Sequence, residues 1–219
     1  MTGQCDLVLP CKDEAPALRQ LIPQVPAVFD VIVVDNGSRD DTAEVARMLG
    51  ARVVIEDMPG YGAAVHAGIE AATAPFVAVM DGDGSFDPVE LLPMLDDVRE
   101  GRADMALGRR RPVRPGVWPW HARMGNKVVV AILRRRSGFA AHDIAPMRVC
   151  RTQALLDLGV EDRRFGYPLE LLARAQTQGW RLVEHDVSYH PRAAGTKSKV
   201  SGTVRGTLRV ARDFGRVLA

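Results

Sequence analysis

Two carboxylates separated by a single glycine, Asp81-Gly82-Asp83, come directly after the apolar run 76–80. We expect that run to be a strand, so both acids would project from the carboxyl edge of a sheet, where open α/β sheets bind ligands. Neighbouring carboxylates repel each other unless a positive charge lies between them. A hard divalent cation that also binds phosphate oxygens would meet that need. The alternative is an ordinary Asp-Gly turn.

Other polar or turn-forming residues end apolar runs earlier in the chain. Pro10 closes the run 6–10, and Asp35 closes the run 31–35. Because parallel strands end at one edge of a sheet, these ends would meet in one crevice, where an acid or amide can bind a nucleobase or ribose. The same residue types also serve as helix N-caps, for which Asp40 and Asp41 are better placed. The expected lining is Glu14, Asp35, Asn36, Asp81 and Asp83.

The chain has 219 residues, of which 47% are hydrophobic and 26% charged, and this fits one globular domain with a sizeable core. Its three cysteines, Cys5, Cys11 and Cys150, are widely spaced, which argues against a disulfide framework and suits a reducing cytoplasm. The first residues lack the pattern of a secretory signal. No run approaches the roughly 20 apolar residues that span a bilayer. We therefore expect a cytoplasmic protein.

Charge is unevenly distributed along the chain. Residues 1–108 carry a net charge of −12 and residues 109–219 a net charge of +14, within a total of +2. An acidic half suits a metal ion, and a basic half suits phosphates or an anionic surface. Alternatively, the two halves attract each other as solvated faces. Nucleic acid is not expected as a partner, because no recognised motif accompanies the basic half and the acidic half would oppose binding.

Apolar runs alternate with segments of helical spacing in the first half. This alternation predicts the α/β class, with a mostly parallel central sheet flanked by helices. The second half is less regular and includes an Arg-, Pro- and Trp-rich segment, 109–119, that we expect to be a loop. The predicted strands are 6–10, 31–35, 52–56, 76–80, 104–108, 143–149 and 181–189, and the predicted helices are 15–24, 42–49, 61–72, 88–100, 120–136, 169–178 and 201–218.

The segment Gly60-Tyr61-Gly62 nearly matches the dinucleotide-binding fingerprint. Asp81 lies 19 residues beyond Gly62, close to where a ribose-binding acid is expected. However, Val65 occupies the third glycine position, and Asp81 belongs to a double-acid motif. A nicotinamide-dependent dehydrogenase is therefore a disfavoured alternative.

Four motifs in this order resemble those of a family 2 glycosyltransferase with the GT-A fold. Such enzymes usually read P-x-x-N-E, V-D-D-G-S-x-D-x-T, G-x-G-x-A and D-x-D, and the corresponding segments here are 10–14, 33–42, 60–64 and 80–83. The second half is similar, more loosely, to the branch of polyprenyl- and dolichyl-phosphate sugar synthases. The residues that carry this likeness are Gly108-Arg109, Asp143 to Arg148, Glu170, and Arg192 through Gly195 to Ser198-Lys199.

The resemblance implies a metal-dependent, inverting glycosyltransferase that uses Mg²⁺ or Mn²⁺ and a UDP- or GDP-sugar. Residues 1–219 would form a single domain, with a nucleotide-sugar-binding half at 1–108 and an acceptor-side half at 109–219. By position, the nucleotide sugar would contact Pro10, Lys12, Glu14, Asp35, Asn36, Gly62 and Asp81. The metal would be held by Asp81 and Asp83, and phosphate oxygens would face Arg109, Arg148, Arg192, Ser198 and Lys199.

Three positions depart from the family pattern. Asn36 replaces the usual second Asp, and Lys12 stands where the lipid-phosphate branch often has Tyr. Ser85 stands where some relatives have a metal-binding Gln. These departures leave two points open, namely the choice between uracil and guanine and the presence of a further metal ligand.

The acceptor decides whether a general base is needed. A sugar hydroxyl requires one, typically Asp or Glu, whereas a phosphate is already an anion and requires cations instead. Glu170, in an apolar setting that could raise its pKa, and Asp143 are the base candidates. Glu170 could equally be a buried or capping carboxylate paired to an arginine. We favour a polyprenyl phosphate acceptor at the cytoplasmic membrane face, with a soluble hydroxyl acceptor or a non-catalytic nucleotide-sugar-binding subunit as alternatives.

The last predicted helix, 201–218, has two stripes. Val204, Leu208 and Ala211 form an apolar stripe, and four arginines between 205 and 216 form a basic one. A basic amphipathic helix can lie on an anionic membrane surface. We favour the alternative, in which its apolar face packs on the domain.

Overall fold

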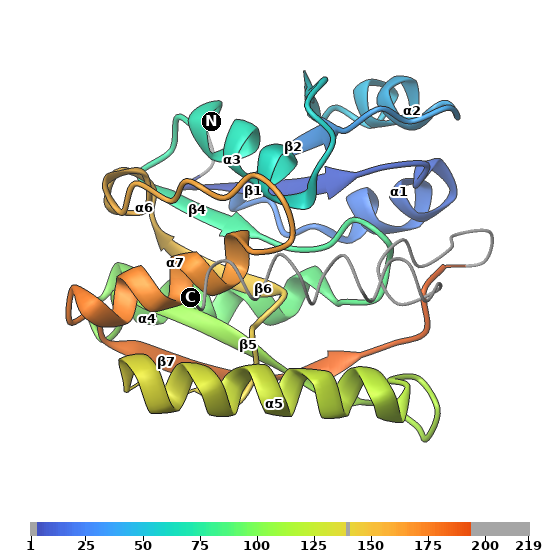
Figure 1. Cartoon of the computed structure of the whole chain (residues 1–219). Helices are drawn as coiled ribbons and strands as arrows, with labels where there is room; N and C mark the ends of the chain where they lie inside the picture. Colours follow the sequence, from blue (N-terminus) through green and yellow to red (C-terminus); the bar gives the residue numbers. More distant parts are fainter. Residues whose placement is uncertain (1–3, 139–140, 194–219) are drawn as a thin grey trace.

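Short runs of Val, Ile and Leu form the centre of a seven-stranded sheet, which the computed structural model shows with helices on both faces (Figure 1). The structure describes residues 4–138 and 141–193. The strands are β1 (Cys5–Cys11), β2 (Phe29–Asp35), β3 (Arg52–Ile55), β4 (Phe76–Val79), β5 (Met105–Pro112), β6 (Met147–Arg151) and β7 (Leu182–Tyr189). The helices are α1 (Ala15–Leu21), α2 (Thr42–Met48), α3 (Tyr61–Glu70), α4 (Leu91–Arg99), α5 (Trp120–Ser137), α6 (Thr152–Asp157) and α7 (Tyr167–Thr177), with 3-10 turns at Ile22–Gln24 and Pro88–Glu90.

The strand order is β3-β2-β1-β4-β6-β5-β7, and every pair is parallel except those made by β6. Because β6 runs antiparallel to β4, its first residues lie at the carboxyl edge of β4, with Arg148 opposite Val79. The parallel register of β1 and β2 likewise brings Cys11 beside Asp35. One edge of the sheet therefore collects acids from parallel strands and an arginine from the reversed one.

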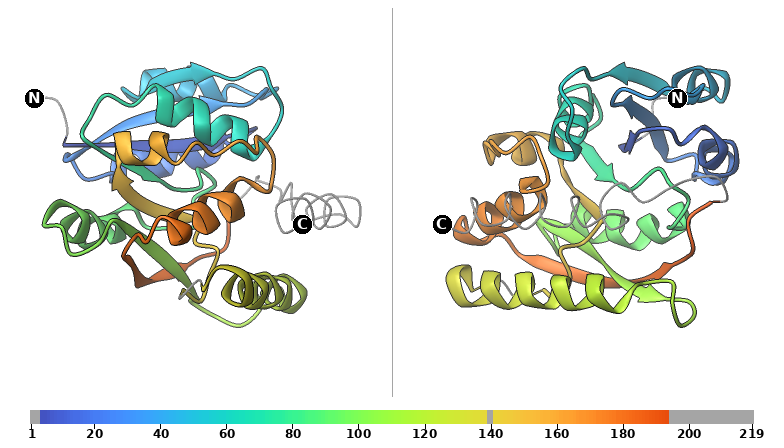
Figure 2. Two further views of the ribbon diagram at one scale, coloured as in Figure 1. Left: turned by 60° about the vertical axis from the view of Figure 1, so that its left-hand side comes forward. Right: turned by 45° about the vertical axis from the view of Figure 1, so that its right-hand side comes forward.

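Alternating side chains of the strands feed two apolar clusters, one on each face of the sheet. The first packs against α1, α2 and α4, and the second against α3, α5, α6 and α7 (Figure 2). Central strands such as β1 are buried on both faces, which explains why they read as continuous apolar runs rather than as alternating ones.

The α/β class and the mostly parallel sheet are confirmed, and three local predictions were wrong. The expected loop at 109–119 begins with the second half of β5, because Arg109 to Pro112 pair with β7 despite their composition. The strand expected at 143–149 begins only at Met147, since Ala145 has a positive φ of 50° that ends extended pairing. Helix α6 was not predicted. The expected helix 201–218 lies outside the described residues.

No helix within 4–138 or 141–193 is both long and apolar enough to cross a bilayer.

Two helical glycines offer a matched test of the packing. A methyl group on Gly68 of α3 would collide with Val8 and lie 2.9 Å from Val34 Cγ2, whereas one on Gly125 of α5 would meet nothing within 4 Å. Gly68→Ala should therefore destabilise the fold by about 1–3 kcal/mol through overpacking. Gly125→Ala should stabilise it by about 0.5–1 kcal/mol through helix propensity. Urea unfolding of both variants measures the difference, and equal effects would contradict this packing of α3 on the sheet.

Candidate active site

A cleft of about 430 Å³ lies at the carboxyl edge of β1, β2 and β4. The chain turns there after each strand, so residues distant in sequence face one space. Most of the expected crevice residues are in its lining, whereas Asp35 is not among the lining residues. The lining comprises Pro10, Cys11, Lys12, Glu14, Asn36, Pro59, Gly60, Tyr61, Ala64, Asp81, Gly82, Asp83, Arg164, Phe165 and Arg192.

Asp81 and Asp83 lie just after the end of β4, where their negative charges repel each other. Burial, followed by the charge of Asp83, raises the pKa of Asp81 to about 6. Asp83 is itself firmly held: its Oδ1 accepts hydrogen bonds from the backbone N–H and hydroxyl of Ser85 at 3.0 and 2.5 Å. Its Oδ2 lies 3.0 Å from Nε of Arg192. The pair thus combines one well-positioned carboxylate with one that loses its charge readily.

The charges of three arginines act in the opposite direction and lower the pKa of Asp81. They are Arg192, Arg110 and Arg148. Arg148 is the most buried, at 3% exposure, on the reversed strand β6. Its Nη2 donates to the Tyr61 hydroxyl at 3.2 Å. Its Nε and Nη1 have no hydrogen-bond partner among the described residues. A buried guanidinium with unmatched donors is costly unless an anion binds there. Arg148 is not itself among the described residues that line the cleft.

Arg110, rather than the predicted phosphate-facing Arg109, is the arginine of β5 whose charge acts on Asp81. Successive side chains of a strand face opposite sides of the sheet, so Arg109 and Arg110 lie on different faces. Nε and Nη2 of Arg110 donate to the two carboxylate oxygens of Asp143 at 2.9 and 2.6 Å. Its guanidinium also stacks 4.1 Å from the ring centroid of Trp118. Burial opposes the charge of Arg110, but Asp143 outweighs burial and raises the pKa of Arg110.

Asp35 and Asn36 shape the loops that border the cleft. Asp35 accepts a hydrogen bond from the Ser38 N–H at 2.8 Å and so fixes the turn after β2. The Asn36 amide donates to the carbonyls of Glu56 and Met58 at 2.8 and 2.7 Å and accepts from the Gly60 N–H at 2.9 Å. An Asp at this position could not donate to the two carbonyls. This contact accounts for the asparagine that replaces the family's second aspartate.

The first turn of α3 is covered by the segment 160–166. The N–H groups of Gly62 and Ala63 donate to the carbonyls of Arg164 and Arg163 at 3.0 and 2.8 Å. A side chain on Gly62 would collide with this segment, so Gly62 permits close packing rather than facing the cleft. Because these N–H groups are used within the chain, the helix start is not open to a pyrophosphate as the dehydrogenase alternative requires. The segment also brings Arg164 and Phe165 into the cleft, which the sequence did not predict.

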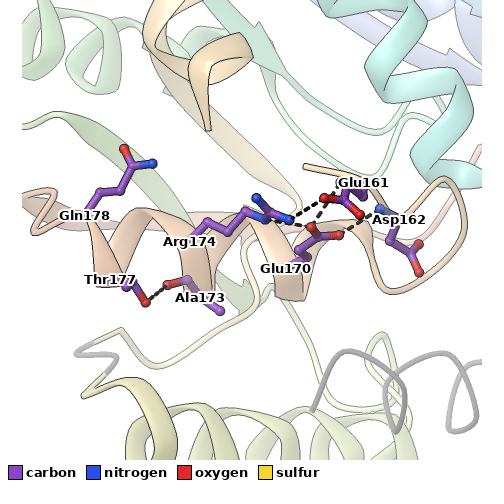
Figure 3. Close-up of a pocket in the computed structure, with 7 residues that line it drawn as sticks. All are labelled: Glu161, Asp162, Glu170, Ala173, Arg174, Thr177 and Gln178. Carbon is purple, nitrogen blue, oxygen red and sulfur yellow. Dashed lines mark hydrogen bonds and ion pairs between the residues drawn. The ribbon is translucent and has the colours of Figure 1, made fainter. Parts of the chain in front are cut away.

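Glu170 lies on α7 beside a separate, shallow pocket of about 740 Å³ (Figure 3). Its carboxylate accepts from the backbone N–H groups of Glu161 and Asp162 at 3.0 and 2.7 Å and pairs with Nε of Arg174 at 2.6 Å. Figure 3 shows these groups turned toward one another. Neither base candidate, Glu170 or Asp143, is among the described residues that line the cleft. Glu170 instead fixes the segment that holds Arg164 and Phe165.

Of the predicted acceptor-side residues, Arg192 lines the cleft, whereas Ser198 and Lys199 lie outside the described residues. Helix 201–218, expected to pack on the domain with membrane contact as the alternative, also lies outside the described residues.

The model of the family described as Glycosyl transferase family 2 matches residues 6–159. Over 213 residues the chain is 54% identical to an uncharacterized glycosyltransferase of Mycobacterium tuberculosis (strain H37Rv), covering 97% of each chain. It is 32% identical over 217 residues to the polyprenol monophosphomannose synthase of Mycolicibacterium smegmatis, covering 90% of this chain and 81% of that one. A crystal structure of the M. tuberculosis glucosyl-3-phosphoglycerate synthase with Mn²⁺, UDP-glucose and phosphoglyceric acid matches with a TM-score of 0.76 at 19% identity, covering 99% and 80% of the two chains. This likeness confirms the expected fold class.

The contacts of Glu170 predict a positioning role. Glu170→Ala should lower the free energy of unfolding by about 2 kcal/mol or more, because two N–H groups and Arg174 lose a charged partner. Amide hydrogen exchange should speed up at Glu161, Asp162, Gly62 and Ala63. Glu161→Ala is the matched control, since the Glu161 side chain is 84% exposed and its loss leaves the bond between Glu170 and Arg174 intact. Unchanged exchange in Glu170→Ala, with activity abolished, would instead indicate a direct chemical role.

The raised pKa of Asp81 predicts a pH-dependent effect on stability. Because the folded-state pKa of about 6 exceeds the ordinary value of 3.8, folding favours the protonated form. The contribution of this group to stability should therefore grow as the pH falls from above 6 to about 4. Asp81→Asn should raise the Tm at pH 7 without added metal, and this gain should vanish near pH 4. Thermal melts across this range measure both, and a lower Tm for Asp81→Asn at pH 7 would contradict the assignment.

Proposed function

This chain belongs to glycosyl transferase family 2, and we propose that it moves a sugar from a UDP- or GDP-sugar to a polyprenyl phosphate, with inversion at the anomeric carbon. The membership makes it a glycosyltransferase. The donor class, the acceptor and the roles of individual residues are our proposal, and the geometry of the cleft supports them.

The donor nucleotide fits the part of the cleft formed by the ends of β1 and β2. Pro10, Lys12 and Glu14 would border the base and ribose, together with Asn36 and the loop that it fixes. The turn stabilised by Asp35 would shape the floor of this part. Phe165 supplies an apolar surface in the same cleft, which suits the face of a base or a sugar.

The donor set at the end of β4 fits a divalent cation. Asp81 and Asp83 would hold Mg²⁺ or Mn²⁺, because carboxylate oxygens suit hard cations and a cation would relieve the repulsion that helps raise the pKa of Asp81. No group of three His, Cys, Asp or Glu side chains suited to a metal occurs among the described residues. Diphosphate oxygens and water would therefore complete the coordination. When bound, the ion would neutralise charge on the leaving diphosphate.

The choice of a phosphate acceptor rests on one observation. Both predicted base candidates are engaged by arginines, Glu170 by Arg174 and Asp143 by Arg110, while the buried Arg148 has two unmatched donors beside Asp81. A hydroxyl acceptor must lose a proton to a base as it attacks, whereas a phosphate oxygen is already ionised. The site is thus richer in groups that hold an anion than in free groups that accept a proton.

In the proposed reaction, an oxygen of the acceptor phosphate attacks the anomeric carbon from the side opposite the nucleoside diphosphate. The new C–O bond forms as the bond to the diphosphate breaks, and the diphosphate leaves as an anion. Arg148, oriented by Tyr61, would hold the acceptor phosphate or the developing negative charge. Pre-placed donors of this kind are worth about 10²–10³ in rate. Arg192, which neutralises Asp83 in this structure, would face the diphosphate.

A second candidate is transfer to a soluble phosphorylated acceptor with a free hydroxyl. The structural likeness to a glucosyl-3-phosphoglycerate synthase solved with phosphoglyceric acid favours it. In that case, the arginines would bind the acceptor's phosphate without making that phosphate the nucleophile, and one of the cleft carboxylates would have to accept the proton.

Label transfer separates these candidates. Purified protein with Mn²⁺ and radiolabelled UDP- or GDP-sugars should transfer label to polyprenyl phosphate, and the product should partition into organic solvent. Arg148→Lys keeps the charge but removes donor groups, so its rate should fall by about 10²–10³. Donor-induced thermal stabilisation of Arg148→Lys should persist and would show that it folds. Labelling of 3-phosphoglycerate alone would overturn the polyprenyl acceptor.

A further inference from the structure

Helix α5 exposes an apolar stripe on the side away from the core. Trp120, Met124 and Val128 are 78%, 52% and 51% exposed, and their spacing of four residues aligns them on one face. The opposite face, with Val129, Val130 and Leu133, is buried in the cluster that α5 shares with α7. Large apolar side chains aligned in this way on a surface indicate an interaction site rather than isolated exposure.

The chain around this stripe is uniformly basic. Residues 109–142 contain nine Arg and Lys side chains and no Asp or Glu. Arg123, Lys127 and Arg135 of α5 are exposed. Basic residues with Trp and aliphatic side chains on one helix are typical of helices that lie in the interface of an anionic bilayer.

The start of α5 is tied to the candidate active site. Asn126 Oδ1 accepts from Nη2 of Arg110 and from the backbone N–H of Ile144, both at 3.3 Å. Trp118, just before the helix, stacks on the same Arg110. Figure 1 shows α5 along the outer side of β5 and β7, starting at the edge where these strands end. A surface that α5 contacts would therefore lie beside the arginines of the cleft.

We propose that the α5 outer face, consisting of Trp120, Met124 and Val128 with Arg123, Lys127 and Arg135, docks on an anionic lipid bilayer. The charge of this face favours a bilayer over a second copy of the chain and over the chain's own residues 194–219. A second copy would bring the same basic face, and residues 194–219 contain six Lys and Arg against one Asp. A nucleic acid would leave the apolar stripe unused. A bilayer matches both the charge and the apolar stripe.

This inference rests on the proposed function, since docking at a membrane would bring the cleft to the headgroup of a polyprenyl phosphate. It concerns a different segment from helix 201–218, for which the sequence favoured packing on the domain and left membrane contact as the alternative. The two sites make different predictions, because substitutions in α5 leave the C-terminal segment unchanged.

Co-sedimentation with vesicles tests the surface. The full chain should pellet with vesicles of phosphatidylcholine and phosphatidylglycerol, and added salt or the omission of phosphatidylglycerol should release it. The double variant Trp120→Ser, Met124→Gln should lower the partition constant at least about tenfold, because the apolar side chains that insert are lost. Met48→Gln is the matched control: Met48 is 71% exposed on α2, and this variant should bind like the wild type. Lys127→Gln, a milder change, should weaken binding by about fivefold.

Donor-induced thermal stabilisation checks that each variant is folded. Equal pelleting of wild type, the double variant and Lys127→Gln would overturn the proposal. A loss of self-association in the double variant, measured by light scattering, would identify a second copy as the occupant and would also overturn it. Because these vesicles contain no polyprenyl phosphate, the result is independent of the acceptor. Transfer to a short, water-soluble prenyl phosphate tests the proposed function without a membrane.

Discussion

The balance of charge at the end of β4 is the constraint on which the site depends. Asp81 and Asp83 are pressed together by the turn after one strand, and the arginines that offset them arrive from other elements. Arg148 reaches them because β6 runs antiparallel to β4, which puts it opposite Val79 in the register. A parallel β6 would carry it to the far edge of the sheet. The reversed strand thus brings a buried positive charge to an edge that otherwise gathers acids.

The acidic first half and the basic second half of the chain both contribute strands to one sheet, and their charges come together at this edge. The acidic first half supplies the strand ends that border the cleft, and the basic second half inserts β6 between β4 and β5. Either half alone would leave an excess of one sign of charge at this edge. Asp81 retains a raised pKa even with three arginines acting on it, which is the behaviour expected of a site that gains by binding a cation. Arg148 has two buried donor atoms without a partner among the described residues, which a bound anion would satisfy.

The features predicted correctly from the sequence are those that short stretches of residues specify on their own. Apolar runs ending in Asp35 and Asp81 located the strands and their edge, because burial on both faces leaves a continuous apolar run. Partners set by long-range pairing were not predictable. Three consecutive arginines, 109–111, give no indication that Arg110 is the one clamped by Asp143, since that depends on the register of β5 with β7. The engagement of Glu170 depends on the path of 160–166, as does the entry of Arg164 and Phe165 into the cleft. Only the i,i+4 spacing of Glu170 and Arg174 gave a local signal.

The central claim is that these two carboxylates bind a cation together with a diphosphate, and Mn²⁺ binding followed by electron paramagnetic resonance tests it most directly. Among the described residues, the proposed metal ligands are two carboxylates, both offset by arginines, so Mn²⁺ alone should bind weakly. UDP or GDP should raise the affinity for Mn²⁺ about tenfold or more, with a reciprocal gain for the nucleotide. Asp83→Asn should abolish this coupling. Equal Mn²⁺ affinity with and without either nucleotide would contradict the account.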